Sequence, residues 1–129
     1  MSLSAIDLVS IVDDDPFVRA ATSSLVRSFG WEARAFESAS DFLASGLQRQ
    51  TRCLVCDIRM EAMDGIELLE RLDRDGLRVP TLFITAYASA HTRERVRAST
   101  ALCLIEKPID AAELEAWIRH ALHDAAARR

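Results

Sequence analysis

Five polar residues, each at or just after the end of a short apolar run, have side chains suited to phosphoryl chemistry. They are Asp13, Asp14, Asp57, Thr85 and Lys107. Three carboxylates brought close together repel one another at neutral pH, so they need raised pKa values or a bound cation. Mg²⁺ meets that need because it prefers octahedral oxygen ligands. An ammonium and a hydroxyl can hold phosphoryl oxygens, which would let Asp57 act as the nucleophile and form an acyl phosphate.

The apolar runs that lead to these residues predict the strands of a parallel sheet. They are short and rich in β-branched residues, as is typical of buried strands. The five predicted strands are residues 6–12, 31–36, 52–57, 80–85 and 101–105. Their alternation with helical segments predicts an α/β domain with helices on both faces and right-handed crossovers. Ligands of such sheets bind at the carboxyl ends of the strands, so the five polar residues should converge on one pocket.

Helix-start signals lie between the predicted strands. Asp15 before Pro16 and Asp110 are the expected N-caps of the first and last helices, Asp64 with Glu67 fits a capping box, and Ser38 opens a short helix that ends before Gly46. The first helix should bury Val18, Ala21, Thr22, Leu25, Val26 and Phe29 and end at Gly30. Residues 89–98 predict a more polar helix with a thin apolar stripe. Gly65 is expected to let the loop before it turn tightly.

Length and composition are those of a single soluble domain. The chain has 129 residues, 50% of them hydrophobic and 28% charged, with a net charge of −4. This charge gives no positive field for binding nucleic acid or an anionic membrane by this domain. No apolar run approaches the roughly 20 residues of a membrane span, and acids interrupt the one early apolar segment. We therefore expect no signal peptide and a cytoplasmic location.

The cysteines and histidines offer weaker candidates for chemistry. Cys53 and Cys56 have the CxxC spacing of redox and zinc sites. In a strand, however, residues three apart point to opposite faces, so buried structural thiols are the favoured interpretation. His120 and His123 are three residues apart on the last predicted helix but lack a third ligand, and His91 is expected to face solvent.

A set of short motifs resembles a known family, the receiver domain of bacterial two-component response regulators. The similarity runs from about residue 6 to residue 122. The motifs are Val12-Asp13-Asp14, Asp57-Ile58-Arg59-Met60, Met63-Asp64-Gly65, Thr85-Ala86 and Lys107-Pro108. The Glu-Lys-Pro and Asp-Ile-Arg-Met runs look most similar to the nitrogen-fixation and nodulation class of regulators, whose receivers usually precede a helix-turn-helix domain.

The resemblance implies a fold and a domain plan. The fold would be flavodoxin-like, (βα)5, with a five-stranded parallel sheet in the order 2-1-3-4-5. Residues 1–129 would form one receiver domain with a core of about residues 6–123, and a DNA-binding output domain would lie beyond residue 129. Such a domain is a switch rather than an enzyme, since it catalyses only its own phosphoryl transfer and dephosphorylation.

The resemblance also implies roles for the site residues. Asp57 would be the phosphoacceptor, and Thr85 and Lys107 would bind the phosphoryl oxygens. The implied Mg²⁺ ligands are Asp13, Asp14, Asp57 and the backbone carbonyl of Arg59. Ala86 would leave room for the phosphoryl group, and Pro108 would follow a cis peptide bond.

The partner implied by the resemblance is a sensor histidine kinase, which donates from a phosphohistidine. Phosphorylation would reshape the face formed by the fourth helix, the fifth strand and the last helix, so that the domain forms a homodimer or releases an effector. Arg93, Arg95 and Arg97 are candidates for ion pairs across that dimer, although a solvated helix face also explains them.

Three positions depart from the family pattern. Glu61 stands where proline usually follows the methionine, and Thr100 replaces a common glycine. Leu104 stands where an aromatic ring usually follows the movement of the conserved threonine, which puts signalling through such a ring in doubt. Arg59 and Tyr87, near the acceptor and the threonine, are positioned to affect the lifetime of the phosphoryl group, and Tyr87 is predicted to slow its hydrolysis.

Two alternatives remain open. A degenerate receiver would act as an interaction module that needs no phosphorylation, which Glu61 and Leu104 favour. A Mg²⁺-dependent phosphohydrolase could use a strand-end Asp on a similar sheet. It would need a second acid to activate water and usually a cap domain, for which this chain has no room.

Overall fold

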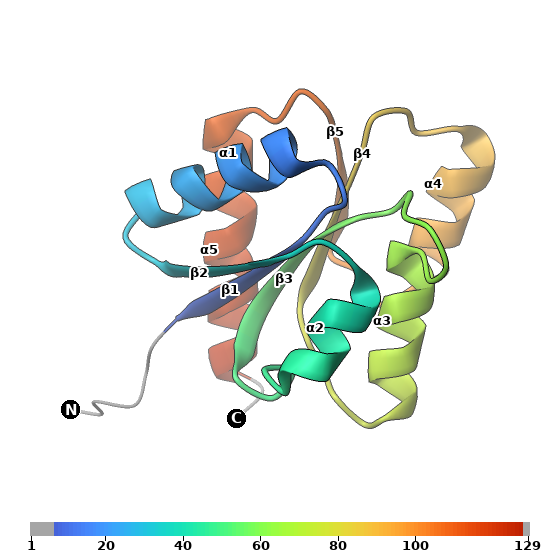
Figure 1. Cartoon of the computed structure of the whole chain (residues 1–129), viewed down its shortest axis with the longest axis horizontal. Coiled ribbons are helices and arrows are strands. Elements are labelled where there is room, and N and C mark those ends of the chain that lie inside the picture. Colours follow the sequence, from blue (N-terminus) through green and yellow to red (C-terminus); the bar gives the residue numbers. More distant parts are fainter. Residues whose placement is uncertain (1–6, 128–129) are drawn as a thin grey trace.

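The computed structural model describes residues 7–127 and the side chains as far as residue 124. Its centre is a five-stranded parallel sheet in the order β2-β1-β3-β4-β5, which confirms the expected topology (Figure 1). The strands are β1 (Leu8–Val12), β2 (Glu32–Phe36), β3 (Thr51–Asp57), β4 (Thr81–Thr85) and β5 (Cys103–Glu106). Because all five strands run the same way, their carboxyl ends lie at one edge of the sheet.

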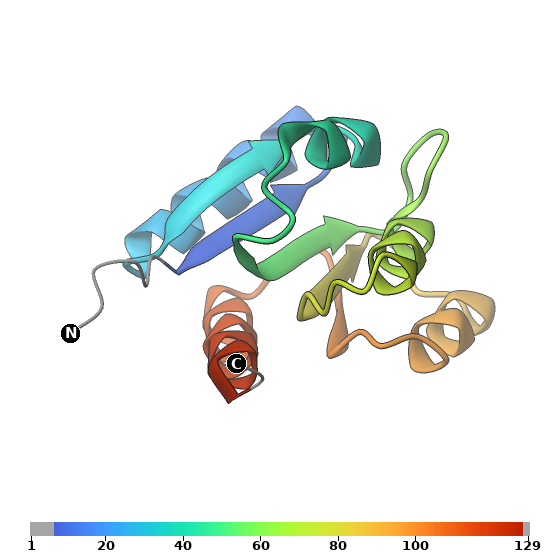
Figure 2. The same ribbon diagram turned by 90° about the horizontal axis from the view of Figure 1, so that it is seen from below.

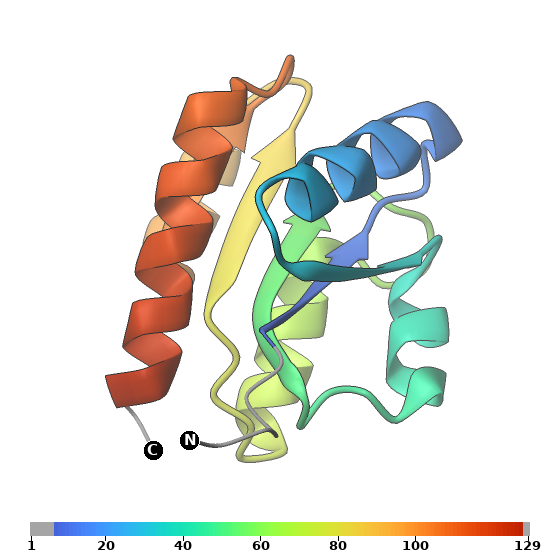
Figure 3. The ribbon, with the colours of Figure 1, turned by 90° about the vertical axis from the view of Figure 1, so that its left-hand side faces the viewer.

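Five helices cover the two faces of this sheet (Figures 1 to 3). The core cluster on one face takes its helical residues from α1 (Pro16–Ser28) and α5 (Ala111–Ala127). The cluster on the other face takes them from α2 (Ala39–Ser45), α3 (Gly65–Arg74) and α4 (Ala90–Arg97). This two-sided covering explains why β1 and β4 are buried along their whole length and are mainly apolar in sequence.

The predicted helix starts are confirmed by their hydrogen bonds. The Asp15 carboxylate accepts the backbone N–H groups of Phe17 and Val18, with Pro16 in the first helical position. Asp64 and Glu67 form a reciprocal capping box with two hydrogen bonds of 2.8 Å. Further caps of this kind are provided by Ser38, Ser89 and Asp110.

Some predicted boundaries and faces were wrong. The last strand begins at Cys103 and not at residue 101, since its pairing with β4 starts where Cys103 meets Leu82. Residue 6, predicted to open the first strand, lies outside the described residues. In α1, Ala21 is exposed and Ser23 is buried. Ser23 can be buried because its hydroxyl donates a hydrogen bond of 2.8 Å to the Arg19 carbonyl.

The central strand β3 contributes side chains to both halves of the core. Cys53 and Val55 belong to the cluster under α1 and α5, whereas Leu54 and Cys56 belong to the cluster under α2 and α3. Both thiols are fully buried and unpaired. The structural interpretation of the CxxC spacing is therefore confirmed, because the two sulfurs lie on opposite faces of the sheet.

The loop from β3 to α3 owes its shape to Ala62 and to close packing at Gly65. Ala62 has a φ of 64°, a left-handed conformation that disfavours residues with a side chain. Gly65 was expected to let this loop turn tightly, and it does so without a positive φ. A Cβ atom at Gly65 would overlap the carbonyl oxygen of Asp57. Glycine is needed here so that α3 can approach the end of β3.

Candidate functional site

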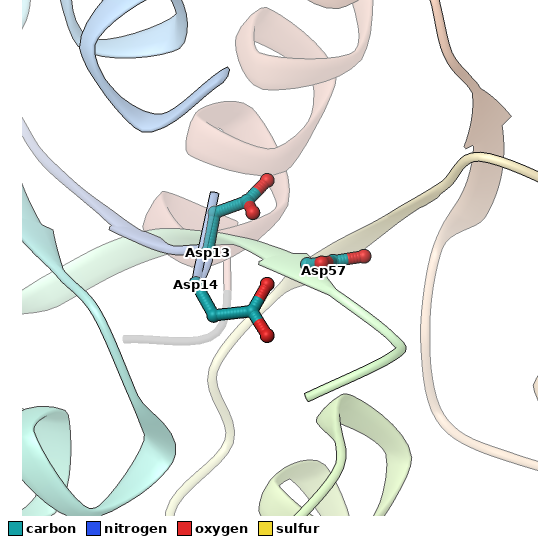
Figure 4. Close-up of side chains that lie close together, drawn as sticks. All are labelled: Asp13, Asp14 and Asp57. Carbon is teal, nitrogen blue, oxygen red and sulfur yellow. The ribbon is translucent and has the colours of Figure 1, made fainter. Parts of the chain in front are cut away.

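Three carboxylates meet at the carboxyl edge of the sheet. Asp13 and Asp14 directly follow β1, and Asp57 is the last residue of β3, the strand that pairs with β1 (Figure 4). One carboxylate oxygen of each residue lies within 4.8 Å of the others. Asp13 and Asp57 are buried and Asp14 is exposed, so the cluster opens to solvent on the Asp14 side.

Only one of the two carboxylate oxygens of Asp13 accepts a hydrogen bond. Its Oδ1 atom accepts the backbone N–H of Asp15 at 2.9 Å. Its Oδ2 atom is buried and accepts no hydrogen bond, although the Lys107 Nζ atom lies 3.4 Å away. A buried carboxylate oxygen without a hydrogen-bond donor is an unfavourable arrangement that a cation ligand would relieve.

Asp57 lies between opposing electrostatic influences. Burial and then the Asp13 charge raise the pKa of Asp57 to about 7, with a smaller rise from Asp14. Lys107, whose Nζ atom lies 3.7 Å from Asp57 Oδ2, and a hydrogen bond from the Arg59 backbone oppose this rise in pKa. The carboxylate is thus poorly stabilised in its charged form, which is the condition under which it gains most from a nearby cation.

Lys107 and Thr85 reach the same edge from β5 and β4. The backbone N–H of Lys107 donates to the Thr85 carbonyl at 2.8 Å, and the Lys107–Pro108 peptide bond is cis, as expected. The Thr85 side chain is buried, but its hydroxyl donates to the Tyr87 carbonyl at 3.2 Å. The structure therefore brings Lys107 to the acids, while the Thr85 hydroxyl is engaged by the loop after β4.

The acids fit a small, hard cation. At Mg²⁺–oxygen distances of about 2.0–2.1 Å, opposite ligands lie about 4 Å apart, close to the spread of the three carboxylate oxygens. The spare oxygen of Asp13 and the raised pKa of Asp57 both indicate missing positive charge. Asp13, Asp14 and Asp57 could therefore hold Mg²⁺, and they are the one group of three or more metal-ligating side chains within residues 7–124.

A cleft of about 430 Å³ extends the site from the acids towards α4. It is open to solvent and lined by Asp14, Ile58, Arg59, Met60, Glu61, Asp64, Thr92 and Arg95. The departure at Glu61 thus adds an exposed acid to the wall of this cleft. Leu104, the other notable departure, is partly buried against the cluster that also contains Val96 of α4.

The sequence pattern did not reveal the exposed ring of Phe17. Phe17 is 84% exposed, and it is joined only by Tyr87, 64% exposed, as an exposed large hydrophobic residue in the described chain. A signal was present, since Phe17 follows the helix-opening Pro16 and lies outside the apolar stripe of α1. By contrast, His91 is exposed, as expected, and His120 and His123 are exposed as well.

The chain belongs to the response regulator receiver domain family, whose sequence model matches residues 9–119. Receiver domains are signalling modules of two-component systems. The resemblance inferred from the strand-end motifs is therefore confirmed, and so is the fold that it implied.

Curated relatives of this chain include a response regulator and a nodulation protein. The response regulator protein TmoT of Ectopseudomonas mendocina is 35% identical over 115 residues, covering 89% of this chain and 52% of that protein. Nodulation protein W of Bradyrhizobium diazoefficiens is 33% identical over 107 residues, covering 83% of this chain and 47% of the relative. The chain thus spans about half the length of these curated relatives, and the likeness to the nodulation class is confirmed.

Solved structures share the architecture. A low-resolution structure of the response regulator StyR matches with a TM-score of 0.84 and 36% identity, covering 97% of this chain and 63% of that one.

In the described part of the chain, no helix combines the length and apolar character that crossing a membrane requires.

Proposed function

We propose that this domain is a phosphorylation-activated switch in which Asp57 accepts a phosphoryl group from a sensor histidine kinase in the presence of Mg²⁺. The observation that carries this proposal is the setting of Asp57. Its carboxylate is buried beside two other acids, with Lys107 Nζ 3.7 Å away and an open cleft alongside. Membership of the receiver family supports the same assignment.

The proposed reaction follows from the groups around Asp57. One carboxylate oxygen attacks phosphorus, the new O–P bond forms as the P–N bond of the donor phosphohistidine breaks, and the imidazole leaves with that electron pair. Lys107 is placed to stabilise the phosphoryl oxygens. Asp13, Asp14, Asp57 and the Arg59 carbonyl would hold Mg²⁺, which supplies charge that keeps the acids ionised and offsets the phosphoryl charge.

The switch would begin at Thr85. A phosphoryl group adds about −1.5 to −2 charge and three strong acceptor oxygens. If the Thr85 hydroxyl turns to donate to one of these oxygens, it must give up its hydrogen bond to the Tyr87 carbonyl. That exchange frees the loop leading to α4 and shifts the balance between two arrangements of the α4–β5–α5 face.

The partners proposed for this domain are a kinase and an output domain. Phe17 and Tyr87 are exposed rings on α1 and on the loop after β4, and Phe17 offers an apolar contact for the kinase beside the acids. We propose a DNA-binding output domain beyond residue 129, which is supported by the fact that the matched segment covers only about half of each curated relative. This domain itself would bind neither DNA nor membrane.

Dimerisation through α4, β5 and α5 would require a change of ion pairs. Arg93 and Arg97 already pair with Glu106 and Glu94 at 2.8 and 2.6 Å within the chain. Salt bridges between two copies would have to replace these contacts. Because exposed pairs contribute little, such an exchange would be nearly neutral in free energy.

Intact mass spectrometry after incubation with Mg²⁺ and a small acyl phosphate tests the proposal. The expected result is a single adduct of about 80 Da, the mass of one phosphoryl group. The Asp57→Asn variant should gain no adduct. Absence of the adduct on the native protein would favour the interaction module that Leu104 and Glu61 suggest. Repeated turnover of a phosphomonoester would instead indicate a phosphohydrolase.

A further inference from the structure

The helix α4 is held to the rest of the domain largely by charge. Among its residues only Val96 is buried. Two ion pairs attach it to neighbouring elements, one from Arg93 to Glu106 at 2.8 Å and one from Arg95 to Asp64 at 3.1 Å. The placement of α4 therefore depends on these pairs more than a helix with a full apolar stripe would.

The side chain of Asp64 is also held in place by capping α3. Its Oδ1 atom caps α3 by accepting the Glu67 N–H, and its own N–H donates to the Glu67 carboxylate. This leaves Oδ2 to accept from Arg95. The two side chains are 34% and 23% exposed, against 51% and 47% for Arg93 and Glu106. The Arg95–Asp64 pair should therefore stabilise the position of α4 more than the Arg93–Glu106 pair does. It is less exposed, and because Asp64 is already held by its capping bonds, forming the pair costs less side-chain entropy.

The Arg95–Asp64 pair lines the cleft beside the acceptor. Asp64 ends the loop that begins directly after Asp57, and Arg95 and Thr92 line the same cleft from α4. Figures 1 and 2 show α4 next to α3, and this loop leads into the start of α3. The Arg95 side chain thus links α4 to the β3–α3 loop, which also contains the Arg59 carbonyl.

We infer that Arg95 is a positioning residue of the phosphoryl-transfer site, which couples the β3–α3 loop to α4 through its ion pair with Asp64. The inference rests on the proposed function, because the loop matters through the metal ligand it supplies. Leu104 provides no aromatic ring to link the acceptor to the surface, and the ion pair gives a connection that needs none. Such coupling is reciprocal: a cation at Asp57 alters α4, and the placement of α4 alters cation affinity.

Backbone-amide NMR during a titration with Mg²⁺ alone tests this coupling in the Arg95→Gln variant. In the native protein, amides after Asp57 and amides of α4 should shift together with one Kd. In Arg95→Gln, the Kd for Mg²⁺ should rise roughly two- to fivefold. The chemical-shift changes of the α4 amides should become smaller, while those of the amides after Asp57 persist. Arg95→Lys should restore most of both effects because it keeps the charge.

Two further variants separate coupling from simple loss of helix stability. Asp64→Asn keeps a capping side chain but removes the charge, so it should match Arg95→Gln, and combining the two should add little. Arg93→Gln removes an ion pair from the same helix outside the cleft and should leave the Mg²⁺ Kd unchanged.

Equal α4 shifts and equal Kd in Arg95→Gln and the native protein would overturn the inference while leaving the proposed function intact. An equal effect of Arg93→Gln would also overturn it, since any loosening of α4 would then suffice. If Mg²⁺ shifted no amide near Asp57 in the native protein, the proposed function would be refuted and this inference with it.

Discussion

Replacing Asp57 with asparagine should stabilise the metal-free protein at neutral pH. Burial and then the Asp13 charge raise the pKa of Asp57 from 3.8 to about 7, even against the attraction of Lys107. If the unfolded chain has the ordinary pKa, this rise corresponds to at most about 4 kcal/mol of lost stability. Water reaches the site from the exposed Asp14 side and screens these charges, so we expect about 1–2 kcal/mol.

The sign of the pH dependence follows from proton binding. The folded state holds the Asp57 proton more tightly than the unfolded chain does, because the folded pKa is the higher one. The folded protein therefore loses stability as the pH rises from about 4 to about 7, and the loss is complete above that range. The Asp57→Asn variant has no proton to lose at this position and escapes the loss.

Urea unfolding in the presence of a chelator, at about pH 5 and at about pH 8, measures this difference. The stability advantage of Asp57→Asn should be larger at the higher pH, and excess Mg²⁺ should remove it by stabilising the native protein alone. Glu70→Gln, at an exposed acid of α3, is the matched control and should show no such gain. An advantage that does not change with pH would refute the assignment of Asp57 as a destabilised carboxylate.

Changes at four other positions separate backbone fit from electrostatics around the site. Gly65→Ala should lose roughly 1–3 kcal/mol in urea unfolding, because the added methyl overlaps the Asp57 carbonyl; an unchanged midpoint would contradict the close approach. Ala62→Gly should gain about 0.5–1 kcal/mol in thermal unfolding by relieving the left-handed backbone, and a loss would show that the loop is unstrained. Asp13→Asn should lower the pKa of Asp57, as followed by its carboxyl NMR shift, and no fall in that pKa would mean that Asp13 exerts little charge there. Tyr87→Ala should shorten the lifetime of the phosphorylated protein, read as loss of the phosphoryl mass, if the exposed ring crowds the path of water as proposed; an unchanged decay would remove Tyr87 from the mechanism.

Much of the fold and site could be predicted because the signals are local. A cap such as Asp15 or Asp64 acts on backbone groups two or three residues away, so its sequence context contains all the information needed. The meeting of Asp13 with Asp57 follows from the pairing rules of parallel sheets once the strands are known. Lys107 joined them for the same reason, and the distances to both acids agree with that expectation.

What could not be predicted depends on packing between distant segments. The ion pair between Arg95 and Asp64 joins residues 31 positions apart, and nothing in either neighbourhood indicates the other. The direction of the Thr85 hydroxyl depends on the path of the loop that follows it. The physical reason for Gly65 could not be read from the sequence, because conformational freedom and lack of a side chain look the same there.

The alternation of β3 has a practical consequence for measuring motion in this domain. Cys53 and Cys56 are sealed in separate halves of the core, and burial chiefly raises the pKa of both thiols. Neither can react with a thiol reagent until its own layer opens, so each labelling rate reports the local opening free energy of one face of the sheet. Since Cys56 directly precedes Asp57, its labelling rate would report how the proposed phosphorylation tightens or loosens the layer beneath α2 and α3.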